Sequence, residues 1–535
     1  MYTIVSDTAM LDELKIFSRY AWGLNDFFRH TLPPEVCRNM ITDQLQNREK
    51  SFLRILKLGI YDNPRSPYFK LLRHAGIEYG DFVKLVGSEG IEGSLSIIYD
   101  SGVYLTLNEF KGRQPVRRPG LEFPTVPHDF DNPFLVKFYE ARSGGSRSRG
   151  NRIIIDLDLL THEAAYFRLF LETFGLTVSP RGAWREIPPV AVGMKLALRY
   201  SKLGSPLERW FSPTALSLNL KNLKFYIFTR YSILASRMFA NPMPVPEHVP
   251  LNEALKVARW LETKKRQGTP AVLDTNVSAA VRVCLAAREN GFDISGSFFP
   301  GGGEPLTPAK AKIIRETGSR VHCHYSMTEL GTMGLACGNP INLDEVHLLS
   351  DKIAVIQRTK EIGAGGGKVG ALIYTSVLPL CPKLMLNVES DDYGNLESRD
   401  CGCRIGELGY GTHLSNIRSY EKLTSEGVTF LGTELLRVIE EVLPGRFGGG
   451  PTDYQFAEEE VDGLPKVNIV VSPRVGEVDD KDVIDTVVNA LIPYPGGEVM
   501  VRQWCQGNTL RVIRREPYTT SSAKILPLHI TKLSK

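Results

Sequence analysis

Strand-like and helix-like hydrophobic patterns alternate through the middle of the chain. The apolar, β-branched run RIIIDLDLL, Arg152–Leu160, predicts a buried strand. Helical periodicity follows near His162–Phe174, Asn252–Lys265, Val277–Asn290 and Pro308–Thr317. Because strands that alternate with helices pack into a sheet covered by those helices, this pattern predicts an α/β fold.

The regions on either side of this alternation have different patterns. Residues 1–130 mix helical stretches, such as Asp43–Leu58, with a loop rich in Pro, Arg and Gly at Lys111–Pro127. Later, KVGALIYTS (Lys368–Ser376) and PKLMLNVES (Pro382–Ser390) predict two strands separated by turn-forming residues. We therefore expect a helical N-terminal portion that packs on the sheet, and a β-rich subdomain appended to it.

The pattern restarts after about Ser419. A strand-like segment KVNIVVSP precedes a predicted helix over Asp480–Leu491, and the segments EVMVRQW and TLRVIRRE follow. This is enough for an independent α+β domain. We expect a large N-terminal domain over residues 1–419, including the helical portion 1–130, and a small mobile C-terminal domain over residues 420–535 that is joined to it by a hinge.

Composition excludes several classes of protein. With 535 residues the chain is too long for one ordinary core, and its 42% hydrophobic and 23% charged residues are typical of globular proteins. A formal charge of +4 does not indicate a nucleic-acid partner. Eight cysteines do not suggest a disulfide scaffold, and no run approaches the roughly 20 apolar residues that span a bilayer. We expect a cytoplasmic protein with no membrane partner.

Two glycine-rich segments are candidates for ligand binding. SGGSRSRG, Ser143–Gly150, offers hydroxyls and backbone N–H groups beside arginines, a composition that can fold over a polyphosphate. PGGGEP, Pro300–Pro305, follows the strand-like ISGSFF and precedes a helix, which is where open α/β sheets bind ligands. A linker and a plain turn are the respective alternatives.

Six segments in sequence order carry a resemblance to a known family. They are SGGSRSRG, GGGEP, YSMTE (Tyr325–Glu329), NVESDDYG (Asn387–Gly394), IRSYEKLTSEG (Ile417–Gly427) and SSAKI (Ser521–Ile525). Together they resemble the motifs of the adenylate-forming superfamily of acyl-CoA synthetases and adenylation domains, and within it the phenylacetate–CoA ligase-like branch. The resemblance covers roughly residues 130 to 530. It implies ATP, Mg²⁺ and CoA as ligands, and a C-terminal domain that rotates between two half-reactions.

The resemblance also implies a role for individual residues. The candidates for the phosphate loop are Ser143, Gly145 and Ser146, and those for the adenine segment are Gly303, Glu304 and Pro305. The resemblance implies that Tyr325 stacks on the base beside Ser326, that Thr328 contacts the α-phosphate and that Glu329 holds Mg²⁺. It also implies that Asp392 binds the ribose with Arg418, and that Lys524 is the catalytic lysine. Asp391 stands where the family has Gly, so the ribose ligand is either Asp391 or Asp392. The sequence departs from the family at Ser148 and Gly150 of the phosphate loop and at Tyr420 and Thr424 of the hinge.

A second group of residues has the chemistry of a metal site. Cys337, His347, Cys401 and Cys403 can supply the four soft or borderline ligands that structural Zn²⁺ prefers. The phenylacetate–CoA ligase-like branch resembles this arrangement as well. The alternative is that these are buried free cysteines. Cys323 lies between His322 and His324 on a predicted strand, where alternation points the two histidines away from the cysteine.

These observations favour an ATP-dependent ligase that converts an aromatic or other small carboxylic acid into an acyl-adenylate and then a CoA thioester. Negative charge develops as a carboxylate attacks the α-phosphate, so a cation must be in place beforehand, here Lys524 with Mg²⁺ at Glu329. A carrier-protein thiol or an amine is the alternative acceptor. A degenerate, non-catalytic binding subunit is the alternative of a different class. The sequence has no G-x-G-x-x-G between a predicted strand and a predicted helix with an acid about twenty residues further on, the context that dinucleotide-binding oxidoreductases require.

Overall fold

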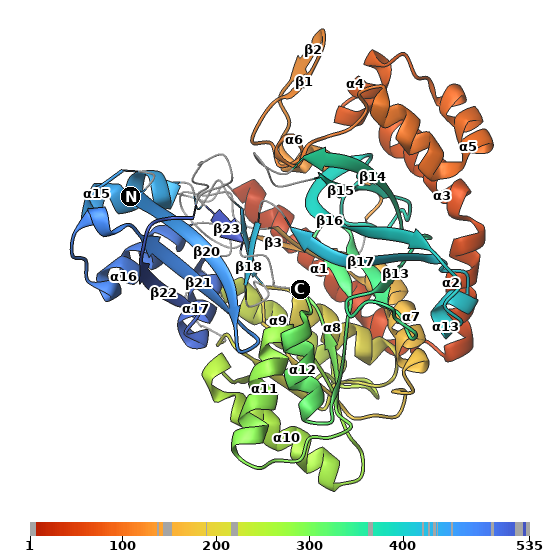
Figure 1. The fold of residues 1–535 in the computed structure, drawn as a ribbon. Helices are drawn as coiled ribbons and strands as arrows, with labels where there is room; N and C mark the ends of the chain where they lie inside the picture. Colours follow the sequence, from red (N-terminus) through yellow and green to blue (C-terminus); the bar gives the residue numbers. More distant parts are fainter. Residues whose placement is uncertain are drawn as a thin grey trace.

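Three larger sheets organise the part of the chain that the structure describes. The structure is a computed structural model, and the described residues are 7–135, 138–142, 152–188, 190–215, 223–361, 368–419, 422–425, 428–431, 435, 437–450, 453–493, 497–518 and 528–530. Figure 1 shows a green and yellow α/β layer, a teal antiparallel sheet beside it, and a blue C-terminal unit. The predicted α/β fold class is confirmed.

The first sheet is parallel and has the strand order β10-β9-β8-β5-β6-β7. Its strands are β5 (Arg181–Trp184), β6 (Arg209–Ser212), β7 (Glu247–His248), β8 (Val272–Thr275), β9 (Phe298–Gly301) and β10 (Arg320–Cys323). Neighbouring residues alternate between its faces, so that Val272 and Phe298 pack in one core cluster, and Leu273 and Phe299 in another. Both faces are therefore buried, as is typical of a parallel sheet.

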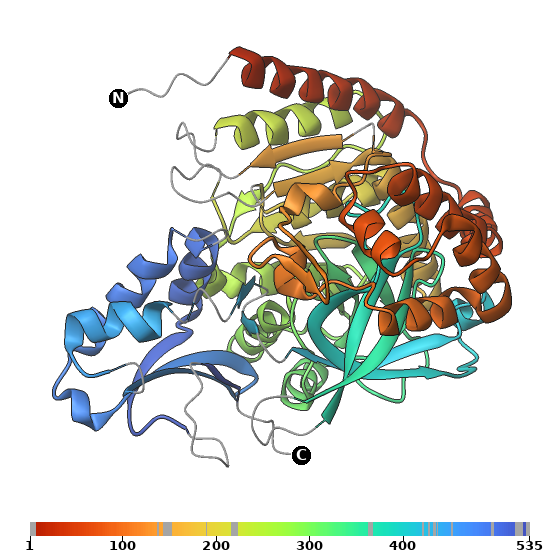
Figure 2. The ribbon, with the colours of Figure 1, turned by 90° about the horizontal axis from the view of Figure 1, so that it is seen from above.

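Helices cover both faces of this sheet. One face carries α7 (Leu157–Thr173), α8 (Val192–Lys202) and α9 (Leu223–Ser236), and the other carries α10 (Ala254–Arg266), α11 (Val277–Glu289) and α12 (Pro308–Glu316). The four predicted helices of this region are thus present within a few residues of their expected ends. Figure 2 shows that α1 (Asp7–Arg29) lies outside the first layer, alongside α9.

The predicted strand over Arg152–Leu160 is only half correct. β4 (Arg152–Asp156) pairs with β3 (Phe138–Arg142), but α7 begins at Leu157. The reason is a helix cap, because the carboxylate of Asp156 accepts a hydrogen bond of 2.7 Å from the backbone N–H of Leu159. The apolar residues after Asp156 therefore belong to the buried side of a helix.

The second sheet is antiparallel, in the order β11-β12-β13-β17-β16-β15-β14. Its strands are β11 (Tyr325–Met327), β12 (Gly331–Ala336), β13 (Val346–Leu348), β14 (Ile353–Glu361), β15 (Lys368–Ser376), β16 (Val388–Ser398) and β17 (Thr412–Ser419). The predicted strand at Lys368–Ser376 is confirmed. The one predicted over Pro382–Ser390 starts only at Val388, because Asn387 has φ 48° and its side chain donates to the Leu95 carbonyl at 2.7 Å.

The N-terminal portion is mainly helical. Its helix α2 (Pro34–Gln46) packs on α7, whereas α3 (Arg48–Ile55), α4 (Pro67–His74), α5 (Tyr79–Asp100) and α6 (Leu107–Phe110) pack on this antiparallel sheet. The helix predicted over Asp43–Leu58 is divided at Asn47, whose side chain bonds Asp43. The predicted loop Lys111–Pro127 contains a small hairpin of β1 (Val116–Arg118) and β2 (Leu121–Phe123).

The C-terminal unit, Leu435–Ile530, has a mixed sheet in the order β22-β21-β20-β23. Its elements are α15 (Leu443–Phe447), β20 (Tyr454–Val461), β21 (Leu464–Val471), α16 (Asp480–Leu491), α17 (Gly497–Gly507), β22 (Leu510–Arg514) and β23 (Leu528–Ile530). They enclose a core of their own around Trp504 and Phe456. A two-stranded ribbon of β18 (Lys422–Ser425) and β19 (Val428–Leu431) precedes this unit.

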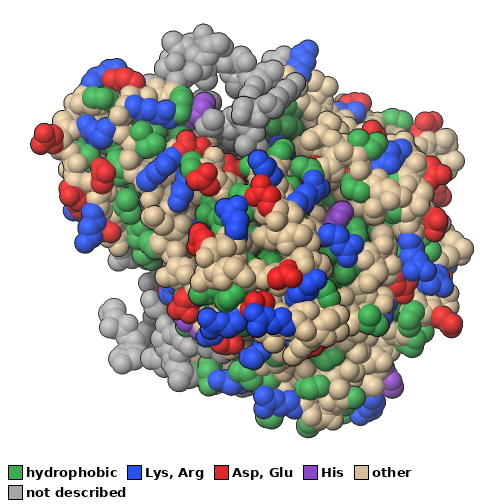
Figure 3. All heavy atoms as spheres, turned by 60° about the horizontal axis from the view of Figure 1, so that its bottom comes forward, with side chains coloured by type: hydrophobic (Ala, Val, Ile, Leu, Met, Phe, Trp, Pro, Cys, Tyr) green, Lys and Arg blue, Asp and Glu red, His purple; other side chains and the backbone are tan. Residues whose placement is uncertain are grey.

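The surface gives no sign of a dominant charge on the side seen in Figure 3. Lysine and arginine side chains are interspersed there with aspartate and glutamate. Among the described helices, none combines the length and the apolar character that a membrane crossing requires. Basic and acidic residues are interspersed along the sequence as well, and their formal net charge is +4.

Candidate functional site

The carboxyl edge of the parallel sheet brings two of the predicted segments together. β9 ends at Gly301, which lies opposite Cys323 of β10, and the N–H of His324 donates to the Gly301 carbonyl at 2.9 Å. The glycine turn that leaves β9 therefore lies beside the chain that enters β11. Gly303 has φ +81°, a backbone conformation that strongly favours glycine. This edge is where ligands bind in open α/β sheets.

Glu304 points into the protein and fixes the shape of this turn. Its carboxylate accepts from the N–H of Ser278 at 2.7 Å and from the Lys310 ammonium at 3.0 Å. Burial acts to raise the pKa of Glu304, but Lys310 and Ser278 outweigh it and lower that pKa. Gly303 is exposed and Pro305 is half-buried, so the backbone of the turn is the part that faces outward.

Tyr325 and Asp392 meet across the antiparallel sheet. The Tyr325 hydroxyl donates to Asp392 Oδ2 at 2.7 Å and lies 2.8 Å from the hydroxyl of Tyr374. Burial, with Asp392 beside it, raises the pKa of Tyr325 well above its usual value. Alternation along β16 places Asp391 and Asp392 on opposite faces of the sheet, so that Asp392 is the acid on the side of Tyr325.

The turn after β11 carries Thr328 and Glu329. Thr328 and Ser326 are exposed, whereas the carboxylate of Glu329 is mostly buried and forms an ion pair with Lys111. Lys111 follows directly after α6 and is distant in sequence. A carboxylate held in this way is a hard oxygen ligand of the kind that Mg²⁺ accepts.

A buried charge cluster lies beneath this turn. The Glu163 carboxylate of α7 accepts from Lys352 at 2.9 Å, from Arg199 at 3.1 Å and from the N–H of Thr332 at 2.8 Å. Gly331, at φ +74°, approaches so closely that an added Cβ would lie 2.2 Å from Glu163 Oε1. The cluster therefore anchors the chain immediately after Glu329.

This anchor predicts a pH-dependent stability. Lys352 and Arg199 overcome the effect of burial and lower the pKa of Glu163 to about 2. A carboxyl with a depressed native pKa stabilises the fold fully above its unfolded value near 4.5, and this stability is lost as the pH falls towards 2. We expect Glu163→Gln to cost about 3–5 kcal/mol at pH 7, because it leaves two buried cations underpaired.

Urea unfolding at pH 3, 5 and 7 measures this effect. The difference between wild type and Glu163→Gln should shrink as the pH falls from 5 to 3. Glu289→Gln, which changes an exposed carboxylate at the end of α11, serves as the matched control. An equal loss of stability in both variants would contradict the anchoring role of Glu163.

Arg418 lies near the end of β17, opposite Tyr393 of β16. Its guanidinium donates to Asp344 Oδ2 at 2.8 Å, and Asp344 also accepts from the N–H groups of Asn416 and Ile417. Arg418 is thus held one residue away from the pairing position of Asp392. The structure brings the two predicted ribose-binding residues onto neighbouring strands.

Several predicted residues lie outside the described part of the chain. They are the phosphate-loop residues Ser143, Gly145 and Ser146, the hinge positions Tyr420 and Gly427, and Lys524. Their roles stay predictions. Among the described residues, Lys111, Tyr374 and Asp344 contact predicted site residues but carried no motif in the sequence.

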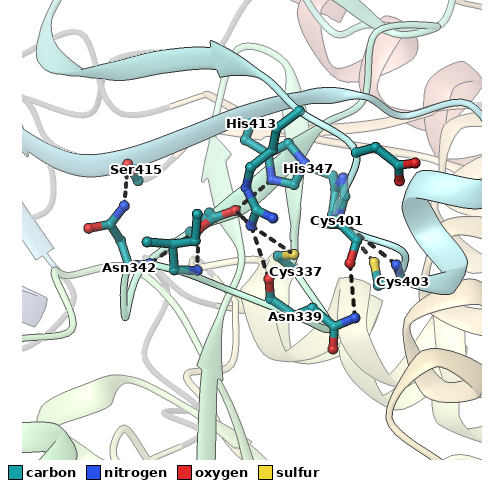
Figure 4. A network of polar contacts seen from close by, with 12 residues as sticks. Cys337, Asn339, Asn342, His347, Cys401, Cys403, His413 and Ser415 are labelled. Carbon is teal, nitrogen blue, oxygen red and sulfur yellow. Dashed lines mark hydrogen bonds and ion pairs between the residues drawn. The ribbon is translucent and has the colours of Figure 1, made fainter.

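The predicted metal ligands converge on one point, as Figure 4 shows. One ligand atom each from Cys337, His347, Cys401 and Cys403 lies within 4.8 Å of every other. His347 Nε2 is 3.1 Å from Cys403 Sγ and 3.5 Å from Cys401 Sγ. The other ring nitrogen, Nδ1, lies 2.6 Å from the Tyr410 carbonyl, which directs the Nε2 lone pair towards the sulfurs.

Neighbouring side chains hydrogen-bond to the sulfur atoms of this cluster. The Cys337 thiol hydrogen-bonds Cys403 and holds the pKa of Cys403 far below its usual value. Arg399 reaches Cys337 Sγ at 3.8 Å and pairs with Glu345, which also contacts His413. All-protein ligation of this type leaves no open position, so the arrangement has the chemistry of a structural site.

A comparison with solved structures finds partial similarity to several proteins. The crystal structure of 2-hydroxyisobutyryl-CoA ligase in complex with 2-HIB-AMP and CoA matches 94% of this chain and 91% of its own, at 14% identity and a TM-score of 0.49. An acyl-CoA synthetase (AMP-forming)/AMP-acid ligase II-like protein from Dyadobacter fermentans DSM 18053 matches 72% of this chain and 87% of its own, at 12% identity and a TM-score of 0.27.

A third similar structure is McyG A-PCP complexed with phenylalanyl-adenylate. It matches 76% of this chain and 67% of its own, at 12% identity and a TM-score of 0.34. No protein-family model and no curated protein matches the chain. The three matched structures have identities of 12–14% and TM-scores of 0.27–0.49, and they assign the chain to no family.

Proposed function

We propose that the chain activates a small carboxylic acid with ATP and transfers the acyl group from an acyl-adenylate to a thiol, that of CoA. The observation that supports this proposal is that segments far apart in the sequence are in contact. The turn with Gly303 leaves β9 beside the chain that enters β11, Tyr325 of β11 bonds Asp392 of β16, and Arg418 lies on the neighbouring strand β17. Each segment resembles, in order, a motif of the adenylate-forming family.

The charges of the site suit the first half-reaction. Attack of a carboxylate on an α-phosphate concentrates negative charge, so catalysis requires cations that are already in place. In our proposal Lys524 supplies one, and Glu329 holds Mg²⁺, which neutralises phosphate charge when bound. Tyr325 provides an aromatic face, and Asp392 with Arg418 provides polar partners for the ribose hydroxyls.

We also propose that Cys337, His347, Cys401 and Cys403 bind a structural Zn²⁺. The fit rests on the donor set, on the separation of the ligand atoms below 4.8 Å and on the lone pair of His347 that Tyr410 orients. The ion would crosslink β12, β13 and the segment before α13 (Arg404–Glu407). It would stabilise the sheet that carries Asp392 and Arg418 without entering the reaction.

AMP release tests the proposed reaction. The purified chain would be incubated with ATP, Mg²⁺ and a panel of aromatic, short-chain and amino acids, with and without CoA. We expect AMP and an acyl-CoA product with one class of acid. Because AMP leaves only when an acceptor takes the acyl group, acid-dependent pyrophosphate release that CoA does not convert into AMP release would favour a carrier-protein thiol or an amine as acceptor. Release of neither pyrophosphate nor AMP with any acid would favour the non-catalytic binding subunit.

The contact between Tyr325 and Asp392 predicts a specific kinetic effect. We expect Asp392→Asn to raise the KM for ATP about 10-fold or more, because hydrogen bonds to a charged group contribute about 1.5–3 kcal/mol. Tyr325→Phe keeps the ring and should have a smaller effect. Glu397→Gln, an exposed change on the same strand, is the control. An unchanged KM for ATP in Asp392→Asn would remove Asp392 from the nucleotide site.

A further inference from the structure

The C-terminal unit packs, through the hairpin of β20 and β21, against helices that cover the parallel sheet. The turn between β20 and β21 reaches α12, where an added Cβ on Gly463 would lie 2.5 Å from Ile313 (Figure 1). From α17, Gln503 donates to Glu186 Oε1 at 2.5 Å, and the Gly507 carbonyl accepts from Arg282 at 3.0 Å. A second group of contacts between the two units, made by charged side chains, lies at the end of β20.

Charged side chains gather where β20 meets the first turn of α12. The hydroxyl of Thr307, the N-cap of α12, lies 2.7 Å from both carboxylate oxygens of Glu460. The Lys310 ammonium lies 3.0 Å from Glu304 and 3.9 Å from Glu460. Only 5% of the Lys310 side chain and 10% of that of Glu460 are exposed, so solvent screens these charges weakly.

A third carboxyl group, that of Glu458, gives this group of side chains more acidic than basic members. Glu458 is two residues from Glu460 on β20 and therefore shares its face of the strand. Glu304, Glu460 and Lys310 all act on it electrostatically, and its partner on β21 is the buried Val467. Glu459 and His529 belong to the other face, where Glu459 pairs with Arg511. Three carboxyls thus face one ammonium among the described side chains of this joint.

We propose that Glu458 and Glu460 form a proton-controlled latch with Thr307 and Lys310, which holds the C-terminal unit against the turn that leaves β9. Lys310 links the two sides, because it pairs with Glu304 of that turn and lies near Glu460 of the C-terminal unit. The latch is therefore connected to the backbone of Gly303. It does not depend on the proposed function, since the contacts exist whatever ligand the turn accepts.

The latch has a defined pH dependence. Burial, only partly offset by Lys310 and reinforced by Glu304 and Glu460, raises the pKa of Glu458 to about 8. Once released into water, the same carboxyl would titrate at its ordinary pKa of about 4.3. The docked form therefore holds one more proton between these values. Docking is strongest below pH 4.3 and weakens by up to about tenfold per pH unit as the pH rises to 8.

Single-molecule energy transfer on the full chain measures docking directly. One dye would be placed on Cys505, the exposed cysteine of α17, and the other on Glu289→Cys at the exposed end of α11. The ratio of docked to undocked molecules would be recorded from pH 5.5 to 9. We expect this ratio to fall with pH and to level off above about pH 8.

Four variants separate the latch from other causes. Glu458→Gln should remain docked and lose the pH dependence, because its side chain cannot ionise. Glu460→Ala and Thr307→Val should each lower the docking ratio, by about threefold or more. Glu459→Gln, on the opposite face of β20, should behave as wild type. Thermal melting of each variant would establish that it is folded.

Two results would overturn the proposal. The first is a wild-type docking ratio that does not change between pH 5.5 and 9. The second is a Glu458→Gln variant that keeps the wild-type pH dependence. Because the readout is a distance and not a reaction, failure of the latch would leave the proposed ligase activity untouched, and the reverse is also true.

Discussion

Lys524→Ala should lower acyl-adenylate formation by about 10²–10³-fold or more while the fold persists. Removal of one preorganised group that stabilises transition-state charge has this magnitude in other enzymes. Isotope exchange between pyrophosphate and ATP in the presence of the acid measures this step alone.

The control for Lys524→Ala is a second lysine near the C-terminus. Lys532→Ala removes the same charge eight residues further on, and it should leave exchange unchanged. Equal melting temperatures for wild type and both variants would establish that the fold is intact. Full exchange activity in Lys524→Ala would exclude this lysine from the reaction.

Loss of zinc should produce the largest change in stability. We expect one zinc per chain, and we expect Cys403→Ser to lose it with a drop in the melting temperature of about 10 °C or more. Structural zinc contributes many kcal/mol to folding, and a chain of several hundred residues shifts by about 2–4 °C per kcal/mol. Elemental analysis and thermal melting, with and without a strong chelator, measure both effects.

A matched cysteine provides the control for the zinc site. Cys505 is exposed on α17, outside the cluster, so Cys505→Ser should retain the zinc and the wild-type melting temperature. Cys337→Ser should behave like Cys403→Ser. Wild-type protein that contains no zinc and does not respond to chelator would establish the alternative, in which these are buried free cysteines.

Local patterns predict the elements that continue without a break in the backbone. Lys368–Ser376, whose last six residues are all buried, and the amphipathic helix Asp480–Leu491 are both present with the expected ends. Boundaries were missed where one polar side chain changes the backbone. Asp156 converts the second half of an apolar run into a helix, and Asn387 delays the start of β16.

The candidate site shows the same limit of local patterns. Single residues within motifs, such as Tyr325 and Asp392, can be proposed from the sequence, but their mutual hydrogen bond cannot, since it depends on how β11 and β16 are arranged. Lys111 was missed because an isolated lysine in a loop has no pattern. The four proposed metal ligands could be grouped from the sequence because cysteine and histidine are the donors that structural zinc prefers.

The docking latch was also beyond the reach of the sequence. AEEEV in β20 resembles an ordinary solvated acidic run, and only the contacts of Glu460 with Thr307 and Lys310 distinguish its face of β20 from that of Glu459, which pairs with Arg511. Pairing between the C-terminal unit and the first turn of α12 is a tertiary arrangement that local patterns do not encode.

Formation of an acyl-adenylate is the step on which the proposed function depends. It would be measured as pyrophosphate exchange into ATP by the wild-type chain, with a panel of aryl, short-chain and amino acids in the absence of any thiol. We expect exchange that requires both Mg²⁺ and one class of carboxylic acid. A folded, zinc-replete chain that shows no acid-dependent exchange with any member of the panel would contradict it.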